Sequence, residues 1–358
     1  MTPQERRTWV RAMGARADWW KRRQEAIVAP DLEVVDAHLH LWDERDFPDP
    51  QDAANPLRTS RYLVDEYLRD AGRGHTVTEC VYIDCGSSYY TDGPASLRPV
   101  GETEYAAGLA EAMAASGGPT RIGAIVGFAD LRDRDLDTVL DAHEARGGGL
   151  FRGIRQSGAR LEDPSARLLA GAAPPGLYAE PAFRRGVARL GERGMTFDAF
   201  QFHFQAEQFV ALAKSAPGTT MIVNHLGTPI GYTPGPASRD PVFVEWARGV
   251  EQMADLPNVV MKLGGIASIV TGYDAHRRDR PPSAQDFVDE RGAYFHHAIR
   301  CFGAERCMFE TNFPVDSVAI GYDGVWNAYK LMAMDYDAGA RDALLAGTTR
   351  RVYRMHVE

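Results

Sequence analysis

Residues 34–42 of the chain read Val34-Val35-Asp36-Ala37-His38-Leu39-His40-Leu41-Trp42. This short apolar run, which contains one acid and two histidines, indicates a buried β-strand near the start of the chain. Because alternate side chains of a strand point the same way, His38 and His40 are expected to project together from its carboxyl end. Neutral imidazoles bind zinc and similar ions, and two on one face form half of a metal site. Two histidines that are only hydrogen-bonded within a loop are the alternative interpretation.

From Pro30 onward, short apolar runs alternate with longer helical patterns, as is typical of βα units. Eight runs are candidate strands, at residues 33–38, 77–84, 121–127, 149–155, 195–202, 220–224, 259–263 and 306–310. Helical patterns lie between them, at residues 103–114, 136–146, 181–193, 206–216, 242–256 and 292–302. An open nucleotide-binding sheet would carry a glycine-rich turn after its first strand, where this chain has His-Leu-His. The pattern therefore predicts an α/β fold, a (β/α)8 TIM barrel over residues 31–358.

The first thirty residues form a different pattern, in which apolar residues recur at roughly helical spacing: Trp9, Met13, Ala17, Trp20 and Ile27. We expect an N-terminal helical extension over residues 1–30 that packs on the barrel or on a second subunit. A homodimer is therefore one expected assembly. The alternative for a basic, Trp-rich helix is the surface of a membrane, which the interspersed polar residues disfavour.

The composition narrows the class of partner. The 358 residues carry a formal net charge of -9, and an acidic surface disfavours nucleic acid and anionic membranes as partners. The four cysteines, few for this length, fall in apolar segments and are expected to be reduced. We expect neither a leader nor a membrane span, because the first residues lack an apolar stretch and no apolar run reaches the roughly 20 residues that span a bilayer. We therefore expect a cytoplasmic protein that acts on a small molecule.

Long Gly/Pro-rich stretches follow the fourth, sixth and seventh predicted strands, at residues 156–179, 226–241 and 264–285. Loops that follow barrel strands lie on the carboxyl-end face, where active sites are built. These three are too long for plain connections and are interpreted as lids or substrate walls.

Two further histidines end predicted strands. His203 follows the fifth strand and His225 follows the sixth, so with His38 and His40 they should converge on the mouth of the barrel. Five other histidines fall on helices or at the terminus and are interpreted as solvated: His75, His143, His296, His297 and His356. His276 lies in a long loop, where a solvated side chain is the favoured interpretation and contact with the substrate is the alternative.

The eighth predicted strand places Glu310 and Asn312 on one face. A buried carboxylate needs a partner, and Lys262 on the apolar seventh strand is the candidate. Glu310 is interpreted as a ligand or general base, and a purely structural Lys262–Glu310 ion pair is the alternative. Arg155 ends the fourth strand, where its guanidinium could hold a substrate carboxylate with two hydrogen bonds, although a salt bridge at the rim is the alternative.

Together these stretches resemble the amidohydrolase superfamily, in the branch of amidohydrolase-related lactonases and decarboxylases. The resemblance runs from residue 33 to the end of the chain. It rests on Asp36-Ala37-His38-Leu39-His40-Leu41-Trp42, Phe151-Arg152-Gly153-Ile154-Arg155, Asn224-His225-Leu226-Gly227-Thr228-Pro229, Asn258-Val259-Val260-Met261-Lys262-Leu263-Gly264-Gly265 and Phe309-Glu310-Thr311-Asn312-Phe313-Pro314-Val315.

The resemblance implies that His38 and His40 are the ligand pair of the first strand and that His203 and His225 are the later-strand histidines. It implies that Lys262 and Arg155 are cations that line the site. The metal ligands expected on this basis are His38, His40 and His225, around a divalent ion, zinc by preference.

One departure from the family pattern affects the chemistry. The family usually ends its eighth strand with Ser-Asp-Trp-Pro, whereas this chain has Thr311-Asn312-Phe313-Pro314. An amide cannot accept a proton near neutral pH and is a poorer metal ligand than a carboxylate. Either Glu310 or Asp316 replaces the missing acid, or the chemistry has changed, or the site no longer hydrolyses a substrate. Some lactonases of this branch work without metal, which leaves a metal-independent site as an alternative.

The leading hypothesis is a hydrolase that opens a lactone, or a related cyclic ester or amide, of a small carboxylated substrate. Glu310, Asn312, His203 and Lys262 are the predicted catalytic residues, and Arg155 and Asp316 are the predicted substrate-binding residues. Two alternatives remain: a non-oxidative decarboxylase on the same scaffold, and a catalytically altered binding protein.

Overall fold

A computed structural model of the chain describes residues 23–42, 61–162, 172–231, 240–268, 271–273 and 275–355. Its eight strands form one parallel sheet, and each strand pairs with the next in chain order. They are β1 (Glu33–Leu39), β2 (Thr76–Ile83), β3 (Arg121–Gly127), β4 (Phe151–Ser157), β5 (Thr196–Phe200), β6 (Thr220–Val223), β7 (Val259–Leu263) and β8 (Cys307–Phe309). Every predicted strand overlaps one of these.

The sheet closes through residues that follow β8. Leu39 forms a parallel bridge with Phe313, and the backbone N–H of His40 donates to the carbonyl of Phe313 at 2.8 Å. One step earlier, the N–H of Asn312 donates to the carbonyl of His38 at 3.0 Å. The predicted (β/α)8 barrel is therefore confirmed.

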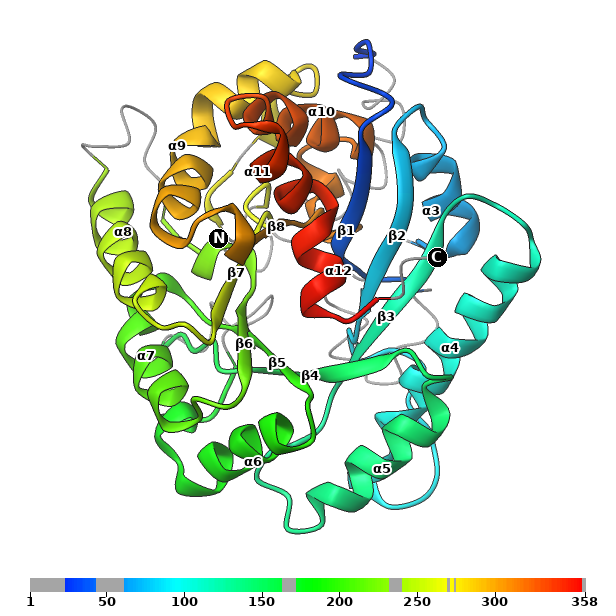
Figure 1. Cartoon of the computed structure of the whole chain (residues 1–358), viewed down its shortest axis with the longest axis vertical. Helices are drawn as coiled ribbons and strands as arrows, with labels where there is room; N and C mark the ends of the chain where they lie inside the picture. Colours follow the sequence, from blue (N-terminus) through cyan, green and yellow to red (C-terminus); the bar gives the residue numbers. More distant parts are fainter. Residues whose placement is uncertain are drawn as a thin grey trace.

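Helices surround the ring of strands (Figure 1). Those anticipated from the sequence are α4 (Val100–Ala115), α5 (Leu136–Arg146), α6 (Pro181–Glu192), α7 (Ala206–Ser215), α8 (Pro241–Ala254) and α9 (Ala284–Phe302). The start of α9 was predicted eight residues too late. Ser283 caps this helix, since its hydroxyl accepts from the N–H of Asp286 at 2.9 Å while the Asp286 carboxylate accepts from the N–H of Ser283. The remaining α-helices described are α3 (Val64–Ala71), α10 (Tyr322–Ala333), α11 (Ala338–Asp342) and α12 (Thr348–Val352).

Side chains from both ends of the chain fill the inside of the barrel. Alternate residues of β1 to β3 face inward, and the C-terminal segment adds Tyr353 and Met355 to the same apolar cluster. A second, larger apolar cluster lies between the strands and the helices. In Figure 1 the helix α12 lies across the ring of strands, next to β1.

The predicted N-terminal helix falls mainly on residues 1–22, which lie outside the described part. Its last eight residues, 23–30, form no helix, so that part of the prediction is wrong. This segment instead bonds to α10. The N–H of Val28 donates to Asn327 Oδ1 at 2.8 Å, Asn327 Nδ2 donates to the carbonyl of Ala26, and Lys330 Nζ donates to the carbonyl of Ala29. Side chains of α10 thus take the hydrogen bonds that a helix would have formed internally.

Two histidines interpreted as solvated are buried. His143 has no exposed surface, lies 2.8 Å from the hydroxyl of Thr103 and stacks on Phe151 at 5.0 Å between ring centroids. His75 is only 8% exposed. Both lie on surfaces that pack against neighbouring elements, which their helical or loop position in the sequence does not reveal. Within the described ranges, no helix combines the length and apolarity needed to cross a bilayer.

Candidate active site

Several predicted site residues meet at the carboxyl ends of the strands. His38 belongs to β1, Lys262 to β7 and Arg155 to β4, while His225 lies two residues after β6 and Glu310 directly follows β8. His38, Lys262 and Glu310 have no exposed surface, and His225 is 6% exposed. Convergence of the strand ends, as predicted from the barrel, brings these five side chains together.

Glu310 is the centre of this group. Its Oε1 atom accepts from the backbone N–H of His225 at 2.7 Å and lies 2.7 Å from Nδ1 of the same residue. Its Oε2 atom lies 2.9 Å from Nδ1 of His38, without hydrogen-bonding geometry. The hydroxyl of Tyr329 donates to the Glu310 carbonyl at 2.8 Å. Side chain and backbone of Glu310 are thus both held in place.

Two glycines that follow β7 leave room for this arrangement. A Cβ atom on Gly264 would lie 2.0 Å from the carbonyl oxygen of Glu310. A Cβ atom on Gly265, whose φ is +65°, would lie 2.1 Å from Nδ1 of His225. Any larger residue at these positions would displace the backbone of Glu310 or the ring of His225.

Lys262 pairs with Asp198 and not with Glu310, so the predicted ion pair is corrected. Its ammonium lies 2.8 Å from Oδ1 of Asp198 and 3.4 Å from Nδ1 of His38. Asp198 occupies the middle of β5 and, like Lys262, has no exposed surface. Sequence reasoning assigned it no role, although an acid in an apolar strand signals a buried partner.

The environment of the first-strand histidines keeps both rings neutral. Burial, together with the positive charges of Lys262 and Arg155, lowers the pKa of His38 well below its ordinary value. Burial and Arg155 do the same to the pKa of His40. Neutral imidazole is the form that binds a metal ion, because protonation removes the lone pair that the ion needs.

The protons of these two rings cannot be placed without conflict. Nδ1 of His40 lies 2.7 Å from the carbonyl oxygen of Ile83 and must donate to it, so Nε2 of a neutral His40 carries a lone pair. That Nε2 atom lies 3.1 Å from Nε2 of His38. If His38 is protonated on Nε2, it donates to His40 and its Nδ1 atom has Lys262 as a donor at 3.4 Å, but the Nδ1 lone pair still faces the nearer Oε2 atom of Glu310 at 2.9 Å.

If His38 is instead protonated on Nδ1, its Nε2 lone pair faces the lone pair of His40 at 3.1 Å. Either tautomer leaves two lone pairs in close opposition, and a bound cation removes that repulsion. Oε2 of Glu310 is also buried without a hydrogen-bond partner in the part of the chain that the structure describes. The residues present therefore fit a metal ion.

The group with metal-binding geometry consists of His38, His225 and Glu310. Each offers one ligand atom, and these three atoms lie within 4.8 Å of one another. Of the three predicted ligands, His38 and His225 belong to this group. His40 does not, because its two nitrogens contact the Ile83 carbonyl and His38. The third member, Glu310, could be found from the sequence, because it lies two residues before Asn312 and therefore on the same face of the strand.

Asn312 and Asp316 contact each other. Nδ2 of Asn312 donates to Oδ1 of Asp316 at 2.9 Å, and the N–H of Ala267 donates to the other carboxylate oxygen at 2.9 Å. Burial raises the pKa of Asp316 to about 8. Both carboxylate oxygens of Asp316 thus accept hydrogen bonds from the protein. The contacts show Asp316 orienting Asn312 and the turn after β7, and none of them bears on its predicted role in substrate binding.

His203 is not part of the cluster. Its Nδ1 atom accepts from the N–H of Ile230 at 3.3 Å, and its Nε2 atom lies 3.7 Å from Oε2 of Glu245. The expectation that four histidines converge is therefore corrected to three. Strand β5 ends at Phe200, so His203 lies beyond the strand end, in the short 3-10 helix His203–Gln205.

Arg155 and two aromatic rings flank the cluster. The guanidinium of Arg155 donates to the carbonyl of Asp84, and its other terminal nitrogen lies 3.4 Å from Nε2 of His38. The ring of Trp42 lies 5.8 Å from that of His40, and the ring of Phe200 lies 5.5 Å from that of His225. Sequence reasoning did not assign these rings to the site, although Trp42 stands in its first motif.

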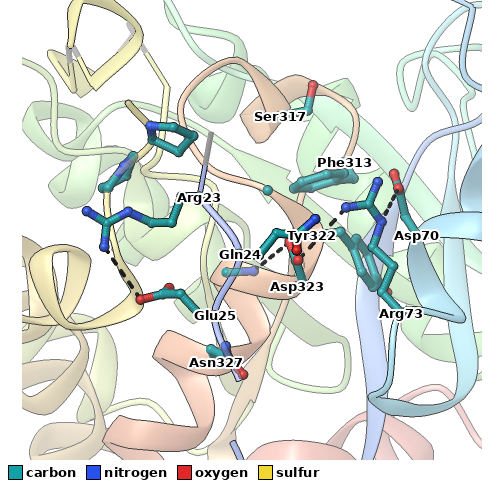
Figure 2. Close-up of a pocket in the computed structure, with 14 residues that line it drawn as sticks. Arg23, Gln24, Glu25, Asp70, Arg73, Phe313, Ser317, Tyr322, Asp323 and Asn327 are labelled. Atoms are coloured by element: carbon teal, nitrogen blue, oxygen red, sulfur yellow. Dashed lines mark hydrogen bonds and ion pairs between the residues drawn. The ribbon is translucent and has the colours of Figure 1, made fainter. Parts of the chain in front are cut away.

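A separate hollow of about 370 Å³ lies beside α3 and α10 (Figure 2). Figure 2 shows Arg73 between Asp70 and Asp323, at 3.3 and 3.9 Å, and Arg23 beside Glu25 at 3.6 Å. Its charged side chains are thus paired with one another. Among the described residues that line it, none is a predicted site residue.

The family model for amidohydrolases matches residues 35–355. The chain belongs to the amidohydrolase family. This amidohydrolase is 29% identical over 334 residues to the uncharacterized protein y4mH of Sinorhizobium fredii, which covers 91% of this chain and 99% of that protein. It is 30% identical over 238 residues to an L-fucono-1,5-lactonase from Burkholderia multivorans, which covers 66% of this chain and 72% of the lactonase.

Among solved structures, the fold matches an amidohydrolase from Burkholderia multivorans that was crystallised with bound zinc. The TM-score is 0.68 at 24% identity, and the match covers 91% of this amidohydrolase and 100% of that chain. The match of the family model over residues 35–355 confirms the resemblance inferred from the motifs at the level of the superfamily.

Proposed function

We propose that the chain is a metal-assisted hydrolase that opens a lactone, or a related cyclic ester or amide, of a small carboxylated substrate. The observation that carries this proposal is the buried cluster of His38, His225 and Glu310, in which facing lone pairs call for a cation. The L-fucono-1,5-lactonase relative supports a lactone as the substrate class.

His38 and His225 would hold the ion, with the Glu310 carboxylate beside it. Zinc is the preferred candidate, because imidazole nitrogen is a ligand that zinc accepts and because the matching Burkholderia structure holds zinc. When bound, such an ion supplies a Lewis acid that polarises a carbonyl and makes water more acidic. Lys262 and Arg155 assist by keeping His38 neutral.

Glu310 is the proposed proton acceptor. Its Oε1 atom is held by His225, which leaves Oε2 as the oxygen without a hydrogen bond in the described structure. Water attacks the carbonyl carbon of the ring and gives a proton to Glu310. The ring carbon–oxygen bond then breaks, and Glu310 returns the proton to the leaving oxygen, which gives the hydroxy acid and restores the carboxylate. Asn312 cannot serve as this acceptor, because its amide is not basic.

Arg155 is the proposed binding residue for the carboxylate of the substrate. Its guanidinium lies at the edge of the cluster, 3.4 Å from His38, and is half-buried. A planar guanidinium suits a carboxylate, since it can donate two parallel hydrogen bonds.

The test compares Glu310→Gln with Glu79→Gln after both are supplied with zinc. Glu79 is a matched control: it is 2% exposed and accepts from Arg350 at 2.7 Å, but on β2 and away from the cluster. Acid release from L-fucono-1,5-lactone and from carboxylated lactones is followed with a pH indicator. Loss of general-base catalysis should reduce turnover by about 10²- to 10⁴-fold in Glu310→Gln and leave Glu79→Gln near wild type.

Metal content by elemental analysis accompanies the assay. One zinc per wild-type chain and turnover of a carboxylated lactone support the proposal. Full activity in Glu310→Gln would remove the proposed base. Release of CO2 from aromatic or unsaturated acids, with no lactone opened, would replace the hydrolase with a decarboxylase.

A further inference from the structure

The C-terminal segment reaches into the barrel from the amino ends of the strands. Arg350 in α12 binds the carboxylate of Glu33, the first residue of β1, at 2.9 Å. Arg152, near the start of β4, donates to the carbonyl of Tyr353 at 2.7 Å. The side chain of Met355 packs against Gly123 of β3, where a Cβ atom would lie 2.2 Å from the methionine methyl group. The backbone around Tyr353 is therefore fixed to several strands.

Tyr353 has no exposed surface, and its ring packs among the apolar side chains inside the barrel. Its hydroxyl donates to Oδ1 of Asp198 at 2.7 Å. Burial raises the pKa of Tyr353 well above its ordinary value, so the hydroxyl keeps its proton for this bond. A residue of the chain end thus contacts a charge that lies just below the candidate active site.

The same carboxylate oxygen also holds Lys262. Oδ1 of Asp198 lies 2.8 Å from the ammonium, and the ammonium lies 5.3 Å from the centroid of the Tyr353 ring. The ammonium also reaches His38, at 3.4 Å from Nδ1. Tyr353 therefore touches both members of the buried pair, through its hydroxyl and through the face of its ring.

Few other groups fix Asp198. Asn224 Nδ2 donates to Oδ1 at the long distance of 3.4 Å, and Oδ2 is buried without a partner among the described residues. Loss of the tyrosine hydroxyl would leave the carboxylate with Lys262 as its one close donor in the described structure. A buried carboxylate short of donors moves toward those that remain, and Lys262 would then move with it.

We propose that Tyr353 is a positioning residue of the candidate active site: its hydroxyl fixes Asp198, and Asp198 holds Lys262 against His38. This inference rests on the proposed function only in that His38 belongs to the reacting site. The competing explanation is that Tyr353 only fills the floor of the barrel.

The experiment uses Tyr353→Phe, which keeps the ring and removes the hydroxyl. The matched control is Tyr67→Phe, because Tyr67 is also fully buried but lies beside Tyr322 and Cys80 and not beside Asp198. The full-length, metal-free protein is labelled with ¹⁵N-histidine, and the His38 ring signals are assigned by their loss in His38→Asn. The inference predicts that the His38 nitrogens shift in Tyr353→Phe, while the remote His143 signals stay and Tyr67→Phe changes neither.

The route through Asp198 is tested with Asp198→Asn alone and combined with Tyr353→Phe. If Tyr353 acts through Asp198, the double variant shifts the His38 signals no further than Asp198→Asn alone. In the zinc-loaded enzyme, Tyr353→Phe should lower lactone turnover by about tenfold, the lower end for loss of a group that orients metal ligands.

Unchanged His38 signals in a folded Tyr353→Phe protein would overturn the inference and leave packing as the explanation. So would full additivity in the double variant. Absence of lactone turnover in the wild type would instead remove the proposed function, and the NMR result on Tyr353 would stand apart from it.

Discussion

Adding one carbon at Gly265 should disable the candidate site while leaving the barrel folded. The new Cβ of Gly265→Ala would lie 2.1 Å from Nδ1 and 2.4 Å from Cγ of His225, where carbon contacts normally lie at about 3.5–4 Å. The φ of +65° adds backbone strain of about 1–2 kcal/mol for a residue with a side chain. The ring of His225 must therefore move by more than about 1 Å from Glu310, and misplacement on that scale reduces turnover by about 10²-fold.

Gly176→Ala separates the two contributions. Gly176 has a nearly identical φ of +67°, and a Cβ atom there would meet nothing within 4 Å. Urea unfolding should show Gly176→Ala destabilised by about 1–2 kcal/mol, and Gly265→Ala by more, because the displaced His225 adds to the same backbone strain. Lactone turnover and zinc content should fall in Gly265→Ala alone. Equal turnover and equal zinc content in the two folded variants would refute the idea that the glycine makes room for His225.

Two further predictions concern the buried Lys262–Asp198 pair and the buried His143. Lys262→Met leaves Asp198 as an uncompensated buried carboxylate, which should lower the free energy of unfolding in urea by about 3–5 kcal/mol. Lys262→Met combined with Asp198→Asn should lose less, because the amide oxygen still accepts from Tyr353; a larger loss in the double variant would contradict this. The prediction for His143 concerns the pH dependence of stability. Burial lowers the pKa of His143 to about 4, so below pH 6.5 the unfolded chain binds a proton that the folded chain does not. Stability is unaffected by this group above pH 6.5 and decreases by about 3 kcal/mol as the pH falls to 4. His143→Gln should remove that part of the dependence, and parallel pH curves for the two proteins would show that His143 is not its source.

The barrel could be predicted from the sequence because its signals are local. Apolar runs and helical patterns alternate along the chain, and each strand pairs with its neighbour in sequence. The same rule places His38, His225 and Glu310 together, since all follow strands whose ends form one ring.

The interior pairings could not be predicted in the same way. Whether Lys262 meets Glu310 or Asp198 depends on how far the strands are staggered around the barrel, and no local pattern encodes that stagger. Tyr353 was equally hidden, because it reaches the site from a C-terminal segment that resembles an ordinary helix and loop in the sequence. His203 was misplaced because β5 ends three residues before it.

The contact of β1 with residues 312 and 313 closes the barrel, and it can form only late in the synthesis of the chain. The carbonyl of His38 accepts from the N–H of Asn312, and the N–H of His40 donates to the carbonyl of Phe313, both in the C-terminal part of the chain. During synthesis, β1 therefore emerges long before its partner, and its edge carries unpaired N–H and C=O groups that invite pairing with another chain. A shortened chain that stops before residue 313 could not close the barrel and would lack part of the candidate active site. This enzyme should therefore be inactive until its synthesis is nearly complete.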